Sequence, residues 1–291
     1  MEIAQASVWT APHELAPGLH LVATPIGNLG DITLRGLWVL RGVDRILCED
    51  TRVTARLLAH FGIDKPLFPY HDHNADRVRP GVLEALRRGE RLALVSDAGT
   101  PLVSDPGYKL VRAALAEGFS VTAAPGPSAA LTALTLSGLP PDRFLFAGFP
   151  PPRSSARRRL FSEWRGIDAT LILFEGPSRL AASLADLAAV LGERDAAVCR
   201  ELTKRHEEVR RGTLSMLAEH YRAASPPRGE VVTVIGPPVA QPAEAVDIEA
   251  LLRERLGRGS LRDAVAELAE ETGLGRQALY RRALALQQSN K

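Results

Sequence analysis

Short apolar runs alternate with helix-like patterns through the first half of the chain. Strand-like runs that end in small or turn-forming residues occur at 19–27, 44–50, 91–97 and 120–126. Apolar residues recur at helical spacing over 31–43, 51–62, 79–90, 106–118 and 127–138. Helix starts are indicated by Asp31 or Thr33 as an N-cap and by Pro127 near a first turn. Strands that alternate with helices predict a parallel sheet covered on both faces.

The alternation of strands and helices is interrupted at residues 139–155, where prolines surround the strand-like segment RFLFAGF. We interpret the segment as the crossing into a second α/β domain. That domain has strand patterns in ATLILFEG, DAAVCREL, EEVRRGTL and RGEVVTVIG, with helices around 178–191 and 213–223. The proline-rich composition of 236–246 is typical of a linker. The expected organisation is a leader at 1–18, α/β domains at 19–138 and 139–240, and a helical tail at 247–290.

The tail shows two short amphipathic helices around TGLG, a pattern that resembles a helix-turn-helix. From Gly275 onward it carries several basic residues and no acid. A helical hairpin that packs on the body of the protein, or that forms a dimer interface, explains the pattern equally well. Both interpretations stay open.

Composition narrows the function classes only modestly. The 291 residues suffice for two domains and a tail, and a net charge of +2 is too small to indicate nucleic-acid binding by itself. Cys48 and Cys199 lie too far apart in the sequence to suggest a zinc motif or a disulfide framework. The N-terminus lacks a signal-peptide pattern, and no apolar run approaches the ~20 residues of a membrane span. We therefore expect a cytoplasmic protein with no membrane partner.

Candidate chemistry gathers in three turns at the ends of predicted strands. These are TPIGN at 24–28, DAGTPLVSDPG at 97–107 and APGPSAA at 124–130. The carboxyl ends of parallel strands form the crevice in which α/β proteins bind ligands, and glycine lets backbone come close to one. Because neither a P-loop nor a G-x-G-x-x-G motif occurs, we expect a small-molecule site of another kind.

Several long blocks identify a resemblance. LVATPIGNLGDITLRGLWVL, CEDTRVTARLLAHFGI, SDAGTPLVSDPGYKLV, PGPSAALTALTLSGLP, LFEGPSR, RELTKRHEEVRRGTL and RGEVVTVIG resemble the ribosomal RNA small subunit methyltransferase I family. That family is part of the tetrapyrrole-methylase-like (class III) group of S-adenosylmethionine enzymes. The resemblance implies methyl transfer to the ribose 2′-hydroxyl of a cytidine in 16S rRNA of the 30S subunit. It also implies two α/β domains with the cofactor between them, an additional C-terminal helical segment, and a homodimer.

The resemblance also assigns a cofactor site, residue by residue. The expected cofactor contacts are Pro25, Gly99, Thr100, Pro101, Val103, Ser128, Ala129 and Phe174. Asn28 and Thr100 stand where tetrapyrrole methylases have aspartate, which argues for the RNA branch of the group. Ala75 and Ser178 replace the glutamate and histidine expected in the narrower family, so neither receives a catalytic role.

Acids and bases at strand ends are the candidates for activating the hydroxyl, which is a weak nucleophile. We select Glu49, Glu201 and Lys204 from a wider set that includes Asp50, Glu175, Arg200 and His206. An alternative is that Glu201 and Arg200 form a structural ion pair. No metal is required, and His71 with His73 is better explained as a polar loop than as a zinc site.

Arginine-rich segments are candidates for RNA contacts, since guanidinium groups suit phosphate. The expected RNA-binding residues are Arg52, Arg153, Arg157, Arg158 and Arg179. A solvated helix surface is the alternative for these arginines. Two other functions remain possible from the residues alone: a tetrapyrrole or other small-molecule methyltransferase of the same fold, and a non-enzymatic RNA-binding assembly factor that uses the tail.

Overall fold

The structure is a computed structural model that describes residues 14–238, 248–272 and 275–289. The chain divides into two compact units, Met1–Pro238 and Val239–Lys291. Most of the predicted leader and most of the predicted linker lie outside the described residues. Within the first unit the strands form two separate five-stranded sheets.

The first sheet is entirely parallel, as the alternation of strands and helices predicts. Its strands run in the order β3-β2-β4-β1-β5. Their bounds are Gly18–Val22 (β1), Arg45–Cys48 (β2), Leu67–Pro69 (β3), Arg91–Val95 (β4) and Val121–Ala124 (β5). The short edge strand β3 was not predicted, because its LFP segment is too brief to show a pattern.

Helices alternate with these strands along the chain, close to the positions that the sequence predicts. Their bounds are Leu34–Gly42 (α1), Thr51–His60 (α2), Ala75–Arg87 (α3), Tyr108–Ala116 (α4) and Ala129–Ser137 (α5). Thr33 is the N-cap of α1, and its side chain accepts a hydrogen bond from the Gly36 N–H. Asp31 instead ends the short 3₁₀ helix η1 (Leu29–Asp31). Pro80 lies inside α3, so the predicted start at residue 79 was wrong.

The second sheet is mixed, with the order β6-β7-β10-β8-β9. Its strands are Phe144–Phe146 (β6), Thr170–Glu175 (β7), Asp195–Arg200 (β8), Glu208–Thr213 (β9) and Val231–Ile235 (β10). Only β6 and β7 pair in parallel, and the other neighbours are antiparallel.

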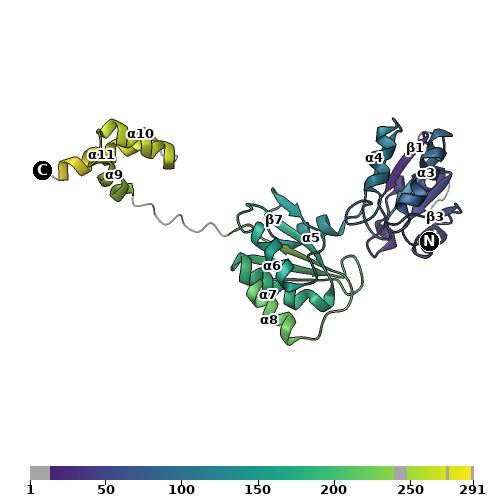
Figure 1. Ribbon diagram of the computed structural model, residues 1–291. Helices are drawn as coiled ribbons and strands as arrows, with labels where there is room; N and C mark the ends of the chain where they lie inside the picture. Colours follow the sequence, from purple (N-terminus) through teal and green to yellow (C-terminus); the bar gives the residue numbers. More distant parts are fainter. Residues whose placement is uncertain (1–13, 239–247, 273–274, 290–291) are drawn as a thin grey trace. The chain divides into compact units, whose positions relative to one another are not determined.

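Helices cover both faces of the second sheet (Figure 1). On one face lie Ser154–Glu163 (α6), Leu180–Leu191 (α7) and Leu214–Ala223 (α8), whose apolar side chains pack with Leu171 and Val198. On the other face α5 packs Ala133 and Leu134 against Ile172 and Val234. The alternation of side chains along β7 and β10 therefore supplies two cores, one on each side.

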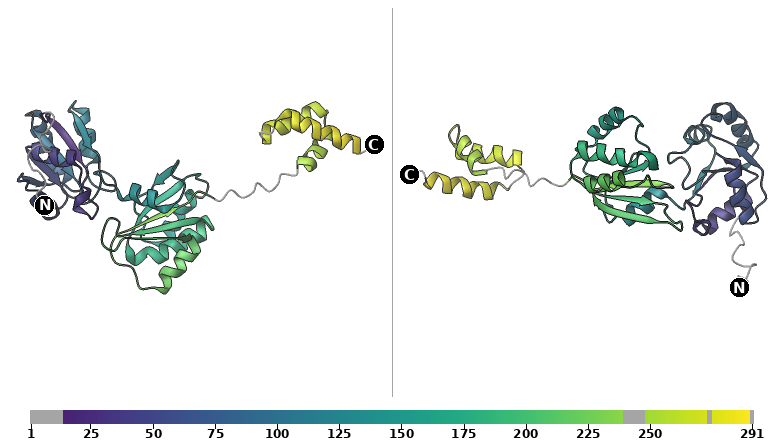
Figure 2. Two further views of the ribbon diagram at one scale, coloured as in Figure 1. Left: turned by 180° about the vertical axis from the view of Figure 1, so that it is seen from behind. Right: turned by 90° about the horizontal axis from the view of Figure 1, so that it is seen from below.

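The second unit contains three helices among the described residues (Figure 2). They are Ile248–Leu256 (α9), Leu261–Thr272 (α10) and Arg276–Ser289 (α11). Leu252, Leu268 and Leu279 are buried where they meet. The sequence predicted α10 and α11 around TGLG, whereas α9 was not predicted. Across the described part of the chain, no helix combines the length and apolar character that crossing a membrane requires.

Candidate functional site

A cavity of about 360 Å³ lies where loops of the first sheet meet strands of the second, and we call it cavity A. The first-sheet loops supply Ile26, the segment Asp97–Thr100, Val103–Asp105, Ser128 and Ala129. The second sheet and its flanking loops supply Phe149, Phe174–Pro177 and Gly229–Val232. Cavity A therefore draws on the carboxyl end of β4, as predicted for a ligand crevice in an α/β fold.

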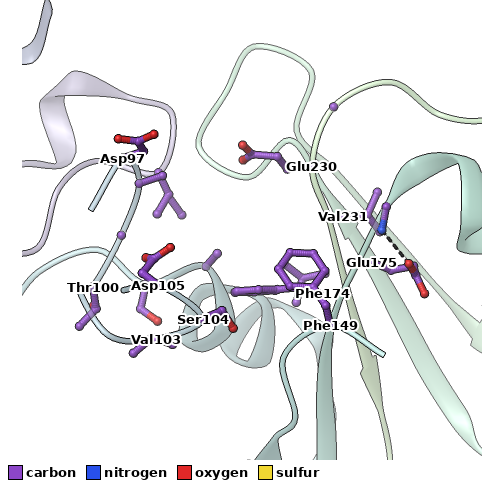
Figure 3. Close-up of a pocket in the computed structure, with 18 of the residues that line it drawn as sticks. Asp97, Thr100, Val103, Ser104, Asp105, Phe149, Phe174, Glu175, Glu230 and Val231 are labelled. Atoms are coloured by element: carbon purple, nitrogen blue, oxygen red, sulfur yellow. Dashed lines mark hydrogen bonds between the residues drawn. The ribbon is translucent and has the colours of Figure 1, made fainter. Parts of the chain in front are cut away.

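The two sides of cavity A differ in chemistry (Figure 3). On one side the ring of Phe149, which is 59% exposed, lies 5.4 Å from the ring of Phe174. Asp97 and Asp105 lie across from these rings, and Glu230 lines the cavity as well. Among the described residues that line it, none is lysine, arginine or histidine. The cavity thus combines an aromatic platform with carboxylates and suits a flat ligand that carries positive charge.

The backbone that precedes Phe149 is hydrogen-bonded to β7. The N–H of Phe174 donates to the carbonyl of Gly148 at 2.9 Å, and the N–H of Ala147 donates to Ile172 at 3.0 Å. Three prolines follow Phe149 and restrict the next φ angles. The position of the Phe149 backbone beside cavity A is therefore well defined, while its ring stays exposed to a ligand.

The loop that follows β4 holds unusual backbone conformations beside cavity A. Leu102 and Ser104 have φ values of 72° and 65°, in the left-handed region that side chains other than glycine rarely adopt. Burial and the neighbouring carboxylates of Asp97 and Asp72 raise the pKa of Asp105. A strained loop with a perturbed carboxyl group is typical of a functional site rather than of an ordinary turn.

A second strained loop closes the rim of cavity A. Glu201 and Thr203 have φ values of 51° and 66°. The Lys204 ammonium donates to Glu201 at 3.0 Å and to Glu230, a cavity residue, at 3.1 Å. The hydrogen bond from Lys204 lowers the pKa of Glu201. Glu201 is therefore a paired carboxylate that positions the rim.

Two glycines allow side chains of the 201–204 loop to pack directly against the backbone. Lys204 crosses Gly27, where a Cβ would lie 2.5 Å from its side-chain carbons. Glu201 lies against Gly229, which has a φ of 91°, and a Cβ at Gly229 would overlap the Glu201 carboxylate. The turn 24–28 of the first sheet is thus in contact with the 201–204 loop of the second.

Six of the eight residues assigned to the cofactor line cavity A. They are Gly99, Thr100, Val103, Ser128, Ala129 and Phe174. Pro25 lines a neighbouring cavity instead, and Pro101 is buried and lines neither of these two cavities. Gly99 is tied to the turn at Thr24 by hydrogen bonds between their backbones, of 2.9 and 3.0 Å.

None of the residues selected as catalytic lines cavity A. Glu201 and Lys204 form the rim described above, and Glu49 lies outside the cavity. Burial and the nearby carboxylates of Asp97 and Asp105 raise the pKa of Glu49, so it belongs to the same electrostatic neighbourhood. The alternative ion pair was wrong: Arg200 pairs with Glu208 at 2.9 Å, whereas Glu201 pairs with Lys204.

The predicted RNA-binding arginines fall into different environments. The expectation for Arg157 is wrong, because its side chain is only 3% exposed and its guanidinium bonds Asp186. Arg52 pairs with Asp50, and Arg179 pairs with the buried Glu175. Arg153 and Arg158 are exposed, and neither has an ion-pair partner within the part of the chain that the structure describes.

His71 and His73 belong to a polar turn. Asn74 accepts a hydrogen bond from the His71 N–H and donates to the Pro69 carbonyl, each at 3.0 Å. Within the described residues no group of three or more potential ligands has a geometry suited to a metal ion.

Sequence reasoning missed the acids of cavity A. Asp97 and Asp105 both belong to the stretch DAGTPLVSDPG, which we interpreted as a backbone cradle. The signal was available, since Asp97 comes within two residues of the end of β4. Phe149 was missed because it lies in the segment interpreted only as a crossing between domains.

Comparison with known proteins identifies the family. The family model for tetrapyrrole (corrin/porphyrin) methylases matches residues 18–218, and the model for the RsmI C-terminal HTH domain matches residues 242–287. The chain is 51% identical to ribosomal RNA small subunit methyltransferase I of Mesorhizobium japonicum, with 95% of this chain and 94% of that protein covered. The chain belongs to the ribosomal RNA small subunit methyltransferase I family.

Other members of the ribosomal RNA small subunit methyltransferase I family match over similar lengths. The protein of Erythrobacter litoralis is 50% identical over 94% of this chain and 96% of its own length. The protein of Escherichia coli O157:H7 is 45% identical, with 92% of this chain and 95% of that protein covered. The match to the C-terminal family model favours the helix-turn-helix interpretation of the tail.

Solved structures share the fold of the first unit at low sequence identity. Diphthine synthase matches with a TM-score of 0.59 and 18% identity, over 75% of this chain and 89% of that chain. A uroporphyrin-III C-methyl transferase from Thermus thermophilus, complexed with S-adenyl homocysteine, matches with a TM-score of 0.53 and 20% identity. The match covers 75% of this chain and 97% of that chain. These likenesses show that the chain shares the fold of these proteins.

Proposed function

We propose that this protein transfers a methyl group from S-adenosylmethionine to the ribose 2′-hydroxyl of a cytidine in 16S rRNA, in the cytoplasm. Relatives that match nearly the whole chain are named for methylation of small-subunit ribosomal RNA. The observation that carries the proposal is cavity A, which places an aromatic platform opposite carboxylates and has no basic lining residue among those described.

The chemistry of cavity A fits S-adenosylmethionine. This cofactor supplies an electrophilic methyl group bound to a positively charged sulfur, and it also carries an ammonium group. Phe149 and Phe174 offer apolar faces for the adenine, since every base can stack on an aromatic ring. Asp97 and Asp105 attract the positive charges, and the small residues Thr100, Ser128 and Ala129 leave room for the chain that joins them.

The carboxylates of cavity A would repel phosphates, so we propose that the RNA backbone lies outside this cavity. For RNA contacts we propose Arg153 and Arg158, which are exposed at the start of α6. The α11 helix contributes Arg276, Arg281 and Arg282, all exposed. We further propose that the protein acts as a homodimer on the 30S subunit.

Isothermal titration calorimetry with S-adenosylmethionine tests the cofactor, and transfer of a labelled methyl group tests the substrate. We expect label in 16S rRNA of 30S subunits from a strain that lacks this gene. Digestion and mass spectrometry should then place the methyl group on the ribose of one cytidine. Label in a precorrin but not in 30S subunits, or no heat of cofactor binding, would refute the proposal.

A further inference from the structure

A smaller cavity of about 210 Å³, which we call cavity B, is lined in part by the turn 24–28. It is lined by Thr24, Pro25, Gly27, Leu29, Val53, Thr54, Arg56, Leu57, Ser96 and Asp97. Three elements build it: the turn after β1, the first two turns of α2, and the end of β4. None of the residues chosen from the sequence as cofactor contacts lines it except Pro25.

Cavities A and B adjoin at Asp97, and the turn after β1 contributes lining residues to both. Thr24, Pro25 and Gly27 line cavity B, while Ile26 lines cavity A. Thr24 is hydrogen-bonded through its backbone to Gly99, a residue of cavity A. One side chain with a reactive group lines both cavities, and it is Asp97.

The carboxylate of Asp97 is held in place at this junction. Its Oδ1 accepts a hydrogen bond of 3.0 Å from the N–H of Asp50, the N-cap of α2. The structure records no hydrogen bond to its Oδ2 from any described residue. The residue is half-buried, so Oδ2 can accept a proton or a hydrogen bond from a ligand in either cavity.

The charge and polarity of cavity B differ from those of cavity A. Arg56 is exposed at its edge and has no ion-pair partner in the described part of the chain. Leu29, Val53 and Leu57 form an apolar wall, and the hydroxyl groups of threonine and serine residues add hydrogen-bonding groups. An apolar wall, hydroxyl groups, one arginine and a carboxylate match a nucleoside with an attached phosphate.

The size of cavity B limits what can enter. Ligand pockets for drug-sized molecules are typically about 300–1,000 Å³, so a cavity of about 210 Å³ is closer in size to a single nucleoside than to a base pair. We therefore expect the nucleotide to leave its stack before it binds, as happens when enzymes flip out a target base.

We propose that cavity B binds the target nucleotide of the RNA and that Asp97 is a catalytic residue that aligns and deprotonates its ribose hydroxyl. This inference rests on the proposed function, because it assumes S-adenosylmethionine in cavity A. The hydroxyl oxygen forms a bond to the methyl carbon while the carbon–sulfur bond breaks and its electron pair stays on sulfur. The hydroxyl proton passes to Asp97 and then to water, and the phosphate lies at Arg56.

Asp97→Asn and Val53→Trp test the two parts of the proposal. Asparagine keeps an acceptor for the Asp50 N–H but is no base, so we expect kcat on 30S subunits, measured at saturating S-adenosylmethionine, to fall 10²–10⁴-fold, the usual range for a general base. Val53 is 39% exposed on α2, so tryptophan there fills cavity B without entering a core. We expect its KM for 30S subunits to rise at least 10-fold with unchanged affinity for S-adenosylmethionine.

Ala55→Trp is the matched control, because Ala55 is exposed on the same helix and does not line cavity B. It should leave both constants unchanged. A second readout is a crystal of the protein with S-adenosylhomocysteine, soaked in cytidine 3′-monophosphate, which should place the ribose beside Asp97 and the phosphate at Arg56.

The outcomes separate this inference from the proposed function. If the wild type binds S-adenosylmethionine and methylates 30S subunits, but Val53→Trp behaves like Ala55→Trp, cavity B is not the nucleotide site. If Asp97→Asn keeps wild-type kcat, Asp97 is not the base. A wild type that fails to bind S-adenosylmethionine or to methylate 30S subunits overturns the proposed function, and this inference falls with it.

Discussion

Arg157 and Arg158 are adjacent in sequence, yet the structure predicts opposite consequences for replacing them. Nε and Nη2 of Arg157 donate to Oδ2 of Asp186 at 2.9 and 2.5 Å, and Asp186 is 8% exposed. Arg158, one residue later on α6, is exposed. We therefore expect Arg157→Met to affect stability and Arg158→Met to affect RNA binding.

The size of the stability effect follows from what Arg157→Met leaves behind. Among the described residues, Asp186 would retain only the hydroxyl of Ser154 as a donor, at 2.9 and 3.0 Å. Removal of one partner from a buried ion pair costs about 3–5 kcal/mol, because the remaining charge is uncompensated. Since 1 kcal/mol shifts Tm by about 2–4 °C in a domain of 150–250 residues, Tm should fall by about 6–20 °C.

Differential scanning calorimetry measures that loss, and binding of 30S subunits at several salt concentrations measures the RNA contact. Arg158→Met should change stability by less than about 0.5 kcal/mol and should reduce the slope of log K against log salt by about 1. Arg157→Met should leave that slope unchanged. The double variant Arg157→Met/Asp186→Leu should recover most of the lost stability, because no charge is left unpaired. The reasoning is refuted if Arg157→Met melts with the wild type and lowers the salt slope.

Three further predictions concern the cavity, its rim and a buried histidine. Phe149→Ala should weaken S-adenosylmethionine binding by about 1–3 kcal/mol in calorimetry, the usual value of a base–aromatic stack; an unchanged Kd would place the adenine elsewhere. Gly229→Ala should displace Glu201 from Lys204 and lower kcat/KM in the methyl-transfer assay, and wild-type kinetics would show that the rim is not needed. Burial lowers the pKa of His20 from 6.5, so the unfolded chain binds a proton first and the free energy of unfolding should fall as pH drops below about 6.5. Urea titrations of His20→Gln should lack this component, and identical pH curves would contradict it.

Local patterns in the sequence were enough to predict most of the first sheet. Strand runs, caps such as Thr33 and the turns after β1, β4 and β5 each depend on neighbours in the chain. The mixed order of the second sheet was not predictable in the same way, because the β7–β10 and β8–β10 pairs join segments far apart in sequence. Register and direction there depend on tertiary packing.

The site was predicted in part for the same reason. Small residues such as Gly99 and Ser128 marked the wall of cavity A, since strand ends of one sheet share an edge. The environment of Arg157 was misjudged because a run of arginines is usually solvated, although Phe161 four residues later marks the buried face of α6. Cavity B could not be foreseen, because it requires α2 and two separate turns to come together.

The charge of cavity A has a consequence for how the catalytic cycle ends. On the proposed function, donation of the methyl group removes the positive charge from sulfur, so the spent cofactor is less cationic than the one that entered. Asp97 and Asp105 then attract it less, while the aromatic contact with Phe149 stays the same. The carboxylates therefore favour exchange of product for fresh cofactor, and this preference should weaken as ionic strength rises.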